Sequence, residues 1–209
     1  MSVLLMIVTE HAISIAALGV SRRDACIALV VNRFFQTNTT VAVLTTTSFQ
    51  ETLKQPSITQ QPLDADHIVQ HVDLRWKFSF VILKLHLNNG PNCTCSHGIE
   101  SYHAYKYFII IGNGDEVATC IHLFCFEGLT EYQTRFVVYL NIGPKNAERN
   151  VDIVLENFWE HNHQNVVVLV TNELGDIDVY TWFPLKGNSR PEIVDKCDGQ
   201  FFRWVIHFF

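Results

Sequence analysis

A helix that runs almost directly into an apolar strand is the feature that most constrains the fold of this chain. In residues 150–163 the apolar side chains recur at i, i+3, i+4 and i+7, which is the pattern of a helix lying on a sheet. They are Val151, Val154, Leu155, Phe158 and Trp159. An apolar strand at 165–170 follows, and the chain returns through a mostly polar turn to another apolar segment at 179–184. This layout predicts one piece of a layered α/β domain with a buried sheet.

The remaining segments extend the same pattern. Helices are predicted at 24–35 and 115–127, and strands at 40–46, 78–87, 105–111, 135–140, 165–170 and 177–183. The second half therefore has the order β-α-β-α-β-β, which implies a mainly parallel sheet with right-handed crossovers. The strands are continuously apolar, which favours burial on both faces. We predict an α/β fold, a layered and mainly parallel sheet flanked by helices, whose last two strands form an antiparallel edge hairpin.

Turn-forming residues suggest how this fold is divided. Residues 88–98 are dense in turn formers, so we predict a first α/β part at 21–98 and a second at 99–209. The chain stops inside the apolar run 200–209, which we interpret as truncation of the second part. Residues 1–20 are apolar but contain Glu10 and His11 and lack a basic residue before the apolar run. They are either a degraded signal peptide or a buried helix.

Charge argues against a nucleic-acid-binding protein, and hydropathy argues against a membrane-spanning chain. The formal net charge is −6, whereas a nucleic-acid-binding protein needs a basic face to meet phosphates. Charged residues make up only 17% of the chain, which suits a domain that normally packs against something else. No stretch reaches the roughly 18 uninterrupted apolar residues of a spanning helix, so we predict no membrane span within the chain.

Cysteines and glycosylation motifs favour an extracellular or luminal location. The chain has six cysteines, more than a cytosolic domain usually needs. Cys93 and Cys95 are too close in sequence to bridge each other, so we expect each to pair elsewhere. Two sequons, at 38–40 and 92–94, make Asn38 and Asn92 candidates for N-glycosylation.

No motif predicts a catalytic, metal or cofactor site. The segment 93–97, Cys-Thr-Cys-Ser-His, lacks the spacing and the second ligand pair of a structural zinc site, so we interpret its cysteines as disulfide candidates. Gly112-Asn-Gly114 lies where a phosphate loop would lie, but Val117 stands in place of the third glycine. Asp115 and Glu116 also put negative charge where a phosphate would bind. We interpret it as a turn and a helix start. The chain also has no Gly-x-Ser-x-Gly elbow, P-loop or His-Glu-x-x-His motif, and we predict a non-enzyme.

Two further groups have a structural and a functional interpretation. His161 and His163 follow the helix, where histidines two residues apart are poor joint ligands, and capping of the helix end is the better explanation. Tyr180 and Trp182 lie on one face of the last strand. We expect them to pack in the core, and the functional alternative is an aromatic wall that contacts a ligand.

Residues 105–197 resemble the amino-terminal extracellular region of divergent insect ionotropic receptors, the variant ionotropic glutamate receptors of chemosensation. The matching segments are the strand 107–111, the helix end 155–159, the strand 165–170, the segment 179–184 (Val-Tyr-Thr-Trp-Phe-Pro) and Cys197. In that family a tyrosine, a threonine and a Phe-Pro pair close this strand, and a cysteine follows in the next loop. The resemblance therefore adds Cys197 to the disulfide candidates.

The resemblance implies an extracellular domain, with lobes like those of periplasmic binding proteins, upstream of the ligand-binding lobes and pore. Full receptors of this family are tetrameric cation channels opened by odorants or tastants, often together with a co-receptor. The implied partners are thus other receptor subunits, and the implied role is ligand detection or subunit assembly. No ligand-contacting residue carries over, because the ligand-gripping residues of glutamate receptors lie in segments that this chain does not reach. The alternatives are a free-standing secreted α/β protein that binds a small molecule, or an enzyme without a recognisable motif.

Overall fold

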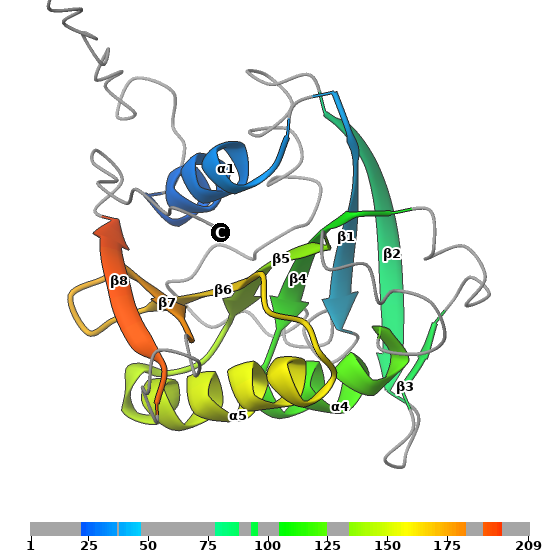
Figure 1. Ribbon diagram of the computed structural model, residues 1–209. Helices are drawn as coiled ribbons and strands as arrows, with labels where there is room; N and C mark the ends of the chain where they lie inside the picture. Colours follow the sequence, from blue (N-terminus) through cyan, green and yellow to red (C-terminus); the bar gives the residue numbers. More distant parts are fainter. Residues whose placement is uncertain are drawn as a thin grey trace, which may run out of the picture.

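The computed structural model describes residues 22–36, 38–46, 78–87, 93–95, 105–124, 134–182 and 190–197. Within these ranges the chain forms one sheet and three α-helices (Figure 1). The helices are α1 (Arg22–Phe34), α4 (Gly114–Phe124) and α5 (Ala147–Glu160), and a 3-10 turn, η3 (Pro144–Asn146), leads into α5. The strands are β1 (Thr40–Thr46), β2 (Ser79–Leu87), β3 (Cys93–Cys95), β4 (Tyr107–Gly112), β5 (Arg135–Leu140), β6 (Val166–Thr171), β7 (Ile177–Thr181) and β8 (Glu192–Cys197).

The sheet has eight strands in the order β3-β2-β1-β4-β5-β6-β7-β8. The central strands β2, β1, β4, β5 and β6 run parallel to one another. β3 is antiparallel to β2 on one side, while β7 and β8 continue the sheet in antiparallel fashion on the other. The predicted α/β class, with a mainly parallel sheet and antiparallel strands at its edge, is confirmed.

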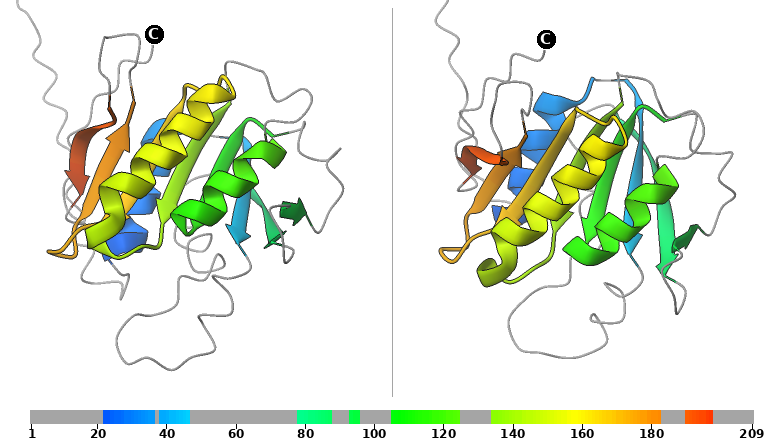
Figure 2. Two further views of the ribbon diagram at one scale, coloured as in Figure 1. Left: turned by 90° about the horizontal axis from the view of Figure 1, so that it is seen from below. Right: turned by 60° about the horizontal axis from the view of Figure 1, so that its bottom comes forward.

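Helices cover both faces of this sheet. α4 and α5 lie side by side on one face, and α1 lies on the other (Figures 1 and 2). The chain steps in one direction from β4 through α4 to β5 and from β5 through α5 to β6. Right-handed crossovers that step the same way place their helices on the same face, which explains why α4 and α5 are neighbours.

Side chains that alternate along each strand fill the two halves of the core. On β4, Phe108 and Ile110 pack with α4 and α5, whereas Ile109 and Ile111 pack on the α1 side. All four side chains have no exposed surface. Because successive strand residues point to opposite faces, a strand buried on both faces must be apolar along its length, and β4, β5 and β6 are apolar except at the end residues Gly112, Arg135 and Thr171. The predicted burial of the sheet on both faces is confirmed.

The helix that dominated the sequence pattern lies on the sheet as expected. α5 begins four residues before the first apolar position of the pattern, and its buried residues are Val151, Val154, Leu155 and Phe158. Trp159, the fifth residue of the predicted face, is half-buried. Its ring lies 6.1 Å from that of Trp182, at the margin of the same core. The helix therefore packs through the face that its sequence predicts.

The structure differs from the prediction at both ends of the sheet. β8 was not predicted, and it pairs with β7, so the antiparallel β6–β7 hairpin lies one strand inside the edge. The sequence of β8, Glu-Ile-Val-Asp-Lys-Cys, does not alternate, and five of its six residues are not buried. An edge strand of this kind carries little hydrophobic signal. The short strand β3 lies within 88–98, which was predicted as a loop.

The two predicted parts, 21–98 and 99–209, contribute strands to the same sheet. β1 from the first part pairs with β4 from the second over the residues from Val41 to Thr45. Residues 1–20 and the C-terminal run 200–209 lie outside the described residues. Among the helices that are described, none is both long and apolar enough to cross a membrane.

Candidate functional site

The strand order reverses at β1, which makes the neighbouring carboxyl ends the first place to look for a site. β1 lies between β2, which follows it in sequence, and β4, from which the sheet continues in the other direction. Open α/β sheets bind ligands outside the carboxyl ends of their strands at such a reversal. Here those ends are Thr46 of β1 and Gly112 of β4, and α4 begins at Gly114.

Close contacts surround two glycines at these strand ends. A methyl group on Gly112 would lie 2.7 Å from Cγ2 and 2.8 Å from Oγ1 of Thr46, so only a glycine fits opposite that side chain. A methyl group on Gly114 would overlap the side chain of Asn150 on α5. Both glycines are therefore required for the close approach of neighbouring elements rather than for a phosphate-binding loop.

The polar groups at the reversal bind one another. The buried hydroxyl of Thr46 donates a hydrogen bond to Oε2 of Glu116, 2.5 Å away, in the first turn of α4. A carboxylate in the first turn of a helix is stabilised by the helix dipole. The pairing of Thr46 with Glu116 was not predicted, because the two residues are 70 positions apart and only the register of β1 with β4 brings them together.

On the α1 side of the sheet, a cationic side chain contacts an aromatic ring near the carboxyl ends of β5 and β6. The Tyr139 hydroxyl at the end of β5 lies 3.0 Å from the Thr171 hydroxyl at the end of β6. The guanidinium carbon of Arg23 lies 5.9 Å from the centre of the Tyr139 ring, and Nε of Arg23 is 3.3 Å from the buried Asp24 carboxylate. These groups link the first turn of α1 to the carboxyl ends of two strands.

Tyr180 and Trp182, the candidates for ligand contact, pack against α5. Tyr180 is buried in the core on the α4 and α5 side, and Trp182 is half-buried next to it. Burial is the largest cause that raises the pKa of the Tyr180 phenol, and the nearby carboxylate of Asp178 raises it further. The phenol therefore stays neutral at physiological pH. The expected core packing accounts for both side chains.

The two histidines after α5 have different roles. Nδ1 of His161 lies 2.8 Å from the Asn157 carbonyl oxygen in the last turn, which agrees with the expected capping. His163 is instead buried, with its ring centre 4.9 Å from that of Phe136 and 6.1 Å from that of Phe158. Among the residues that the structure describes, its Nε2 has no hydrogen-bond partner. Burial, the larger cause, and the neighbouring His161 together lower the pKa of His163 to about 4, so the ring is neutral at pH 7.

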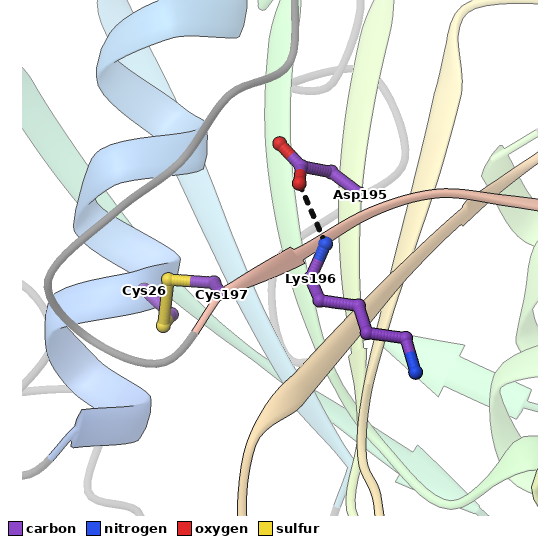
Figure 3. The surroundings of a disulfide bond; sticks show 4 residues. All are labelled: Cys26, Asp195, Lys196 and Cys197. Carbon is purple, nitrogen blue, oxygen red and sulfur yellow. Dashed lines mark hydrogen bonds between the residues drawn. A yellow bond between two sulfur atoms is a disulfide. The ribbon is translucent and has the colours of Figure 1, made fainter.

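A disulfide joins the first and last described elements. Cys197 at the end of β8 is bonded to Cys26 in α1, with a sulfur–sulfur distance of 2.02 Å (Figure 3). Cys197 was a disulfide candidate, whereas its partner was not predicted. The available signal was the apolar face of α1, on which Cys26 lies together with Ile27 and Val30. Cys120 in α4 is also disulfide-bonded.

The remaining candidates lie at the surface or outside the described residues. Asn38 is exposed between α1 and β1 and has φ of 62°. The side chains of Cys93 and Cys95, and the whole of Asn92, lie outside what the structure describes. Among the described residues, no group of three or more His, Cys, Asp or Glu side chains could hold a metal ion.

Comparisons with known proteins do not assign a family. No protein-family model matches the chain, and no curated protein matches it. A solved structure of a PLP-bound protein from Clostridium difficile 630, assigned as an aminotransferase, is similar to 73% of this chain, with 13% sequence identity and a TM-score of 0.37. The match covers 36% of that protein's chain, so this chain spans about a third of its length. A similarity at this level assigns no activity.

Proposed function

We propose that this chain is a non-catalytic extracellular domain of a chemosensory ionotropic receptor, which in its full-length form is a ligand-gated cation channel. Its role is to contribute to ligand detection or to subunit assembly, with other receptor subunits or a co-receptor as partners. The proposal rests on the resemblance of residues 105–197 to that family together with one structural observation, the disulfide between Cys26 and Cys197.

The disulfide supports the proposal because it favours an oxidising compartment for this chain. Disulfides persist in oxidising environments and are rare in the reducing cytosol. Cys26 and Cys197 are both buried, and they hold the first described helix against the last described strand. A bond that joins elements 171 residues apart acts on the whole fold rather than on one loop. A domain with this covalent closure suits the outside of a cell, and we propose that location.

The polar side chains at the carboxyl ends of the strands bind one another. Thr46 is hydrogen-bonded to Glu116, and Tyr139 to Thr171, so these polar side chains hold neighbouring elements together. We propose binding or assembly as the role of this domain, as the resemblance of residues 105–197 implies.

Sequencing of full-length transcripts tests the proposal. We expect the reading frame to continue past Phe209 into ligand-binding lobes and three apolar spans. An abundant message with a stop codon directly after Phe209 would contradict the receptor assignment. In that case, a stable secreted monomer with a saturable small-molecule site would establish the alternative, a free-standing binding protein.

A further inference from the structure

The side chain of Asn38 is exposed. Three other asparagines, at 150, 157 and 172, use their side-chain amides to bind backbone or side-chain oxygens. Asn38 makes no such bond within the part of the chain that the structure describes. Its backbone adopts the left-handed conformation, which asparagine tolerates better than most residues. The conformation explains an asparagine or a glycine here, and within the described residues the exposed amide has no hydrogen bond.

The segment around Asn38 is held in place by its neighbours. The Thr39 hydroxyl donates a hydrogen bond to the Gln36 carbonyl oxygen at 2.7 Å. The Ser79 backbone amide donates to the Thr39 carbonyl oxygen at 3.2 Å, next to the first residue pair of β1 and β2. Thr40, the third residue of the sequon, is exposed at the start of β1. The fold therefore presents the sequon at its surface and buries neither of its essential residues.

We propose that Asn38 carries an N-linked oligosaccharide. The side-chain amide nitrogen of Asn38 attacks the anomeric carbon of an oligosaccharide carried on a lipid pyrophosphate. The new bond joins that nitrogen to the carbon, the carbon–oxygen bond to the pyrophosphate breaks, and the amide proton passes to a base of the transferase. The hydroxyl of Thr40 supplies the Ser or Thr that the Asn-x-Ser/Thr acceptor motif requires. This modification rests on the extracellular location proposed above.

The position of the glycan assigns one edge of the sheet to solvent. Asn38 lies next to the amino end of β1, whereas Thr46 and the strand-order reversal lie at its carboxyl end. Seven strand residues span about 20 Å. The oligosaccharide therefore extends from the amino end of β1, near the end of α1, and its attachment point lies on the opposite side of the sheet from the strand-order reversal.

Secretion of the full chain from eukaryotic cells, in an Asn92→Gln background that removes the other sequon, tests the proposal. We expect a gel-mobility shift that peptide N-glycosidase removes, and conversion of Asn38 to Asp with uptake of heavy oxygen when the enzyme acts in labelled water. Asn38→Gly and Thr40→Ala should abolish the shift. Thr40→Ser should keep it, because serine preserves the sequon. Asn38→Gly suits the left-handed backbone, so the loss of the glycan is separated from misfolding.

The outcomes separate this proposal from the proposed function. An unmodified Asn38 in secreted protein that contains the Cys26–Cys197 bond would overturn the glycan and leave the extracellular assignment standing. An unmodified Asn38 together with free Cys26 and Cys197 thiols would overturn both. A shift that persists in both Asn38→Gly and Thr40→Ala would place the modification elsewhere and also overturn the proposal.

Discussion

At the scale of single residues, two glycines show how the reversal of strand order is packed. Gly112 faces the Thr46 side chain, and Gly114 faces Asn150. The sequence places both glycines between a strand and a helix, and in the structure they are the last residue of β4 and the first residue of α4. It does not reveal which side chains press against them, because those come from β1 and α5, far away in sequence. The turn could be predicted, and the reason for the glycines could not.

Substitution of Gly114 by alanine should therefore destabilise the protein. The added methyl group overlaps Asn150, and forcing extra volume into a packed site costs about 1–3 kcal/mol. Gly143→Ala is the matched control, since nothing lies within 4 Å of the methyl group it adds. Urea unfolding followed by circular dichroism measures the free energy of unfolding of both variants. Equal stabilities of the two variants would show that α4 and α5 do not meet as described.

His163 predicts a pH dependence of stability. The ring is neutral and buried in the folded protein, with a pKa of about 4, against 6.5 when it is unperturbed. The unfolded chain therefore binds the proton first as the pH falls, and stability decreases between about pH 6.5 and pH 4. Each pKa unit corresponds to about 1.4 kcal/mol, so the full loss is on the order of 3–4 kcal/mol.

The variant His163→Phe isolates this effect. Phenylalanine keeps an aromatic ring beside Phe136 and Phe158 but cannot take up a proton. The free energy of unfolding of wild type relative to the variant should fall as the pH is lowered from 7 to 4. Other titrating groups are common to both proteins and cancel in the difference. Parallel curves over this range would mean that His163 is not buried and neutral.

At the scale of elements, the strength of the hydrophobic pattern decided what could be predicted. β1 and β5 have the predicted bounds, and α5 buries the predicted face. These elements are apolar and regularly patterned. β8 was not predicted because it is polar and exposed at an edge of the sheet. β3 was not predicted because it has only three residues and lies within a turn-rich segment. Such edge strands form by pairing with a neighbouring strand, so their own sequences carry little hydrophobic pattern.

The packing of α5 predicts a large cost for Phe158→Ala. Phe158 is fully buried, and its ring centre lies 4.8 Å from that of Phe136 on the central strand β5. Truncation of a buried phenylalanine typically costs about 3–5 kcal/mol. The exposed Glu156 on the same helix provides the control, and Glu156→Ala should change stability by less than about 0.5 kcal/mol. Similar losses for both, measured by urea unfolding, would contradict the described orientation of α5.

At the scale of the whole molecule, one sheet and one disulfide connect segments from both halves of the chain. The pairing of β1 with β4 unites the two predicted parts, and Cys26–Cys197 closes a segment of 171 residues. The sequence indicated an oxidising compartment through its cysteine count and sequons. It could not indicate the pairing, because six cysteines allow 15 complete sets of disulfides and only the fold brings Cys26 to Cys197.

Removal of this disulfide should destabilise the fold. The chain-entropy model gives about 5 kcal/mol for a loop of this length, and measured losses are typically about 2–5 kcal/mol. Cys26→Ala combined with Cys197→Ala should therefore lower the free energy of unfolding by this amount without leaving a buried thiol. In reductant the gap between wild type and the double variant should shrink, because wild type then loses the same bond. A gap that reductant does not change would show that the loss comes from packing rather than from the bond.

Disulfide mapping of the secreted wild-type chain tests the extracellular assignment most directly. Free thiols are alkylated first, and the non-reduced digest is then analysed by mass spectrometry. We expect a linked pair of peptides containing Cys26 and Cys197, which separates on reduction. Recovery of both cysteines as alkylated thiols from folded protein would contradict a domain built for the outside of the cell.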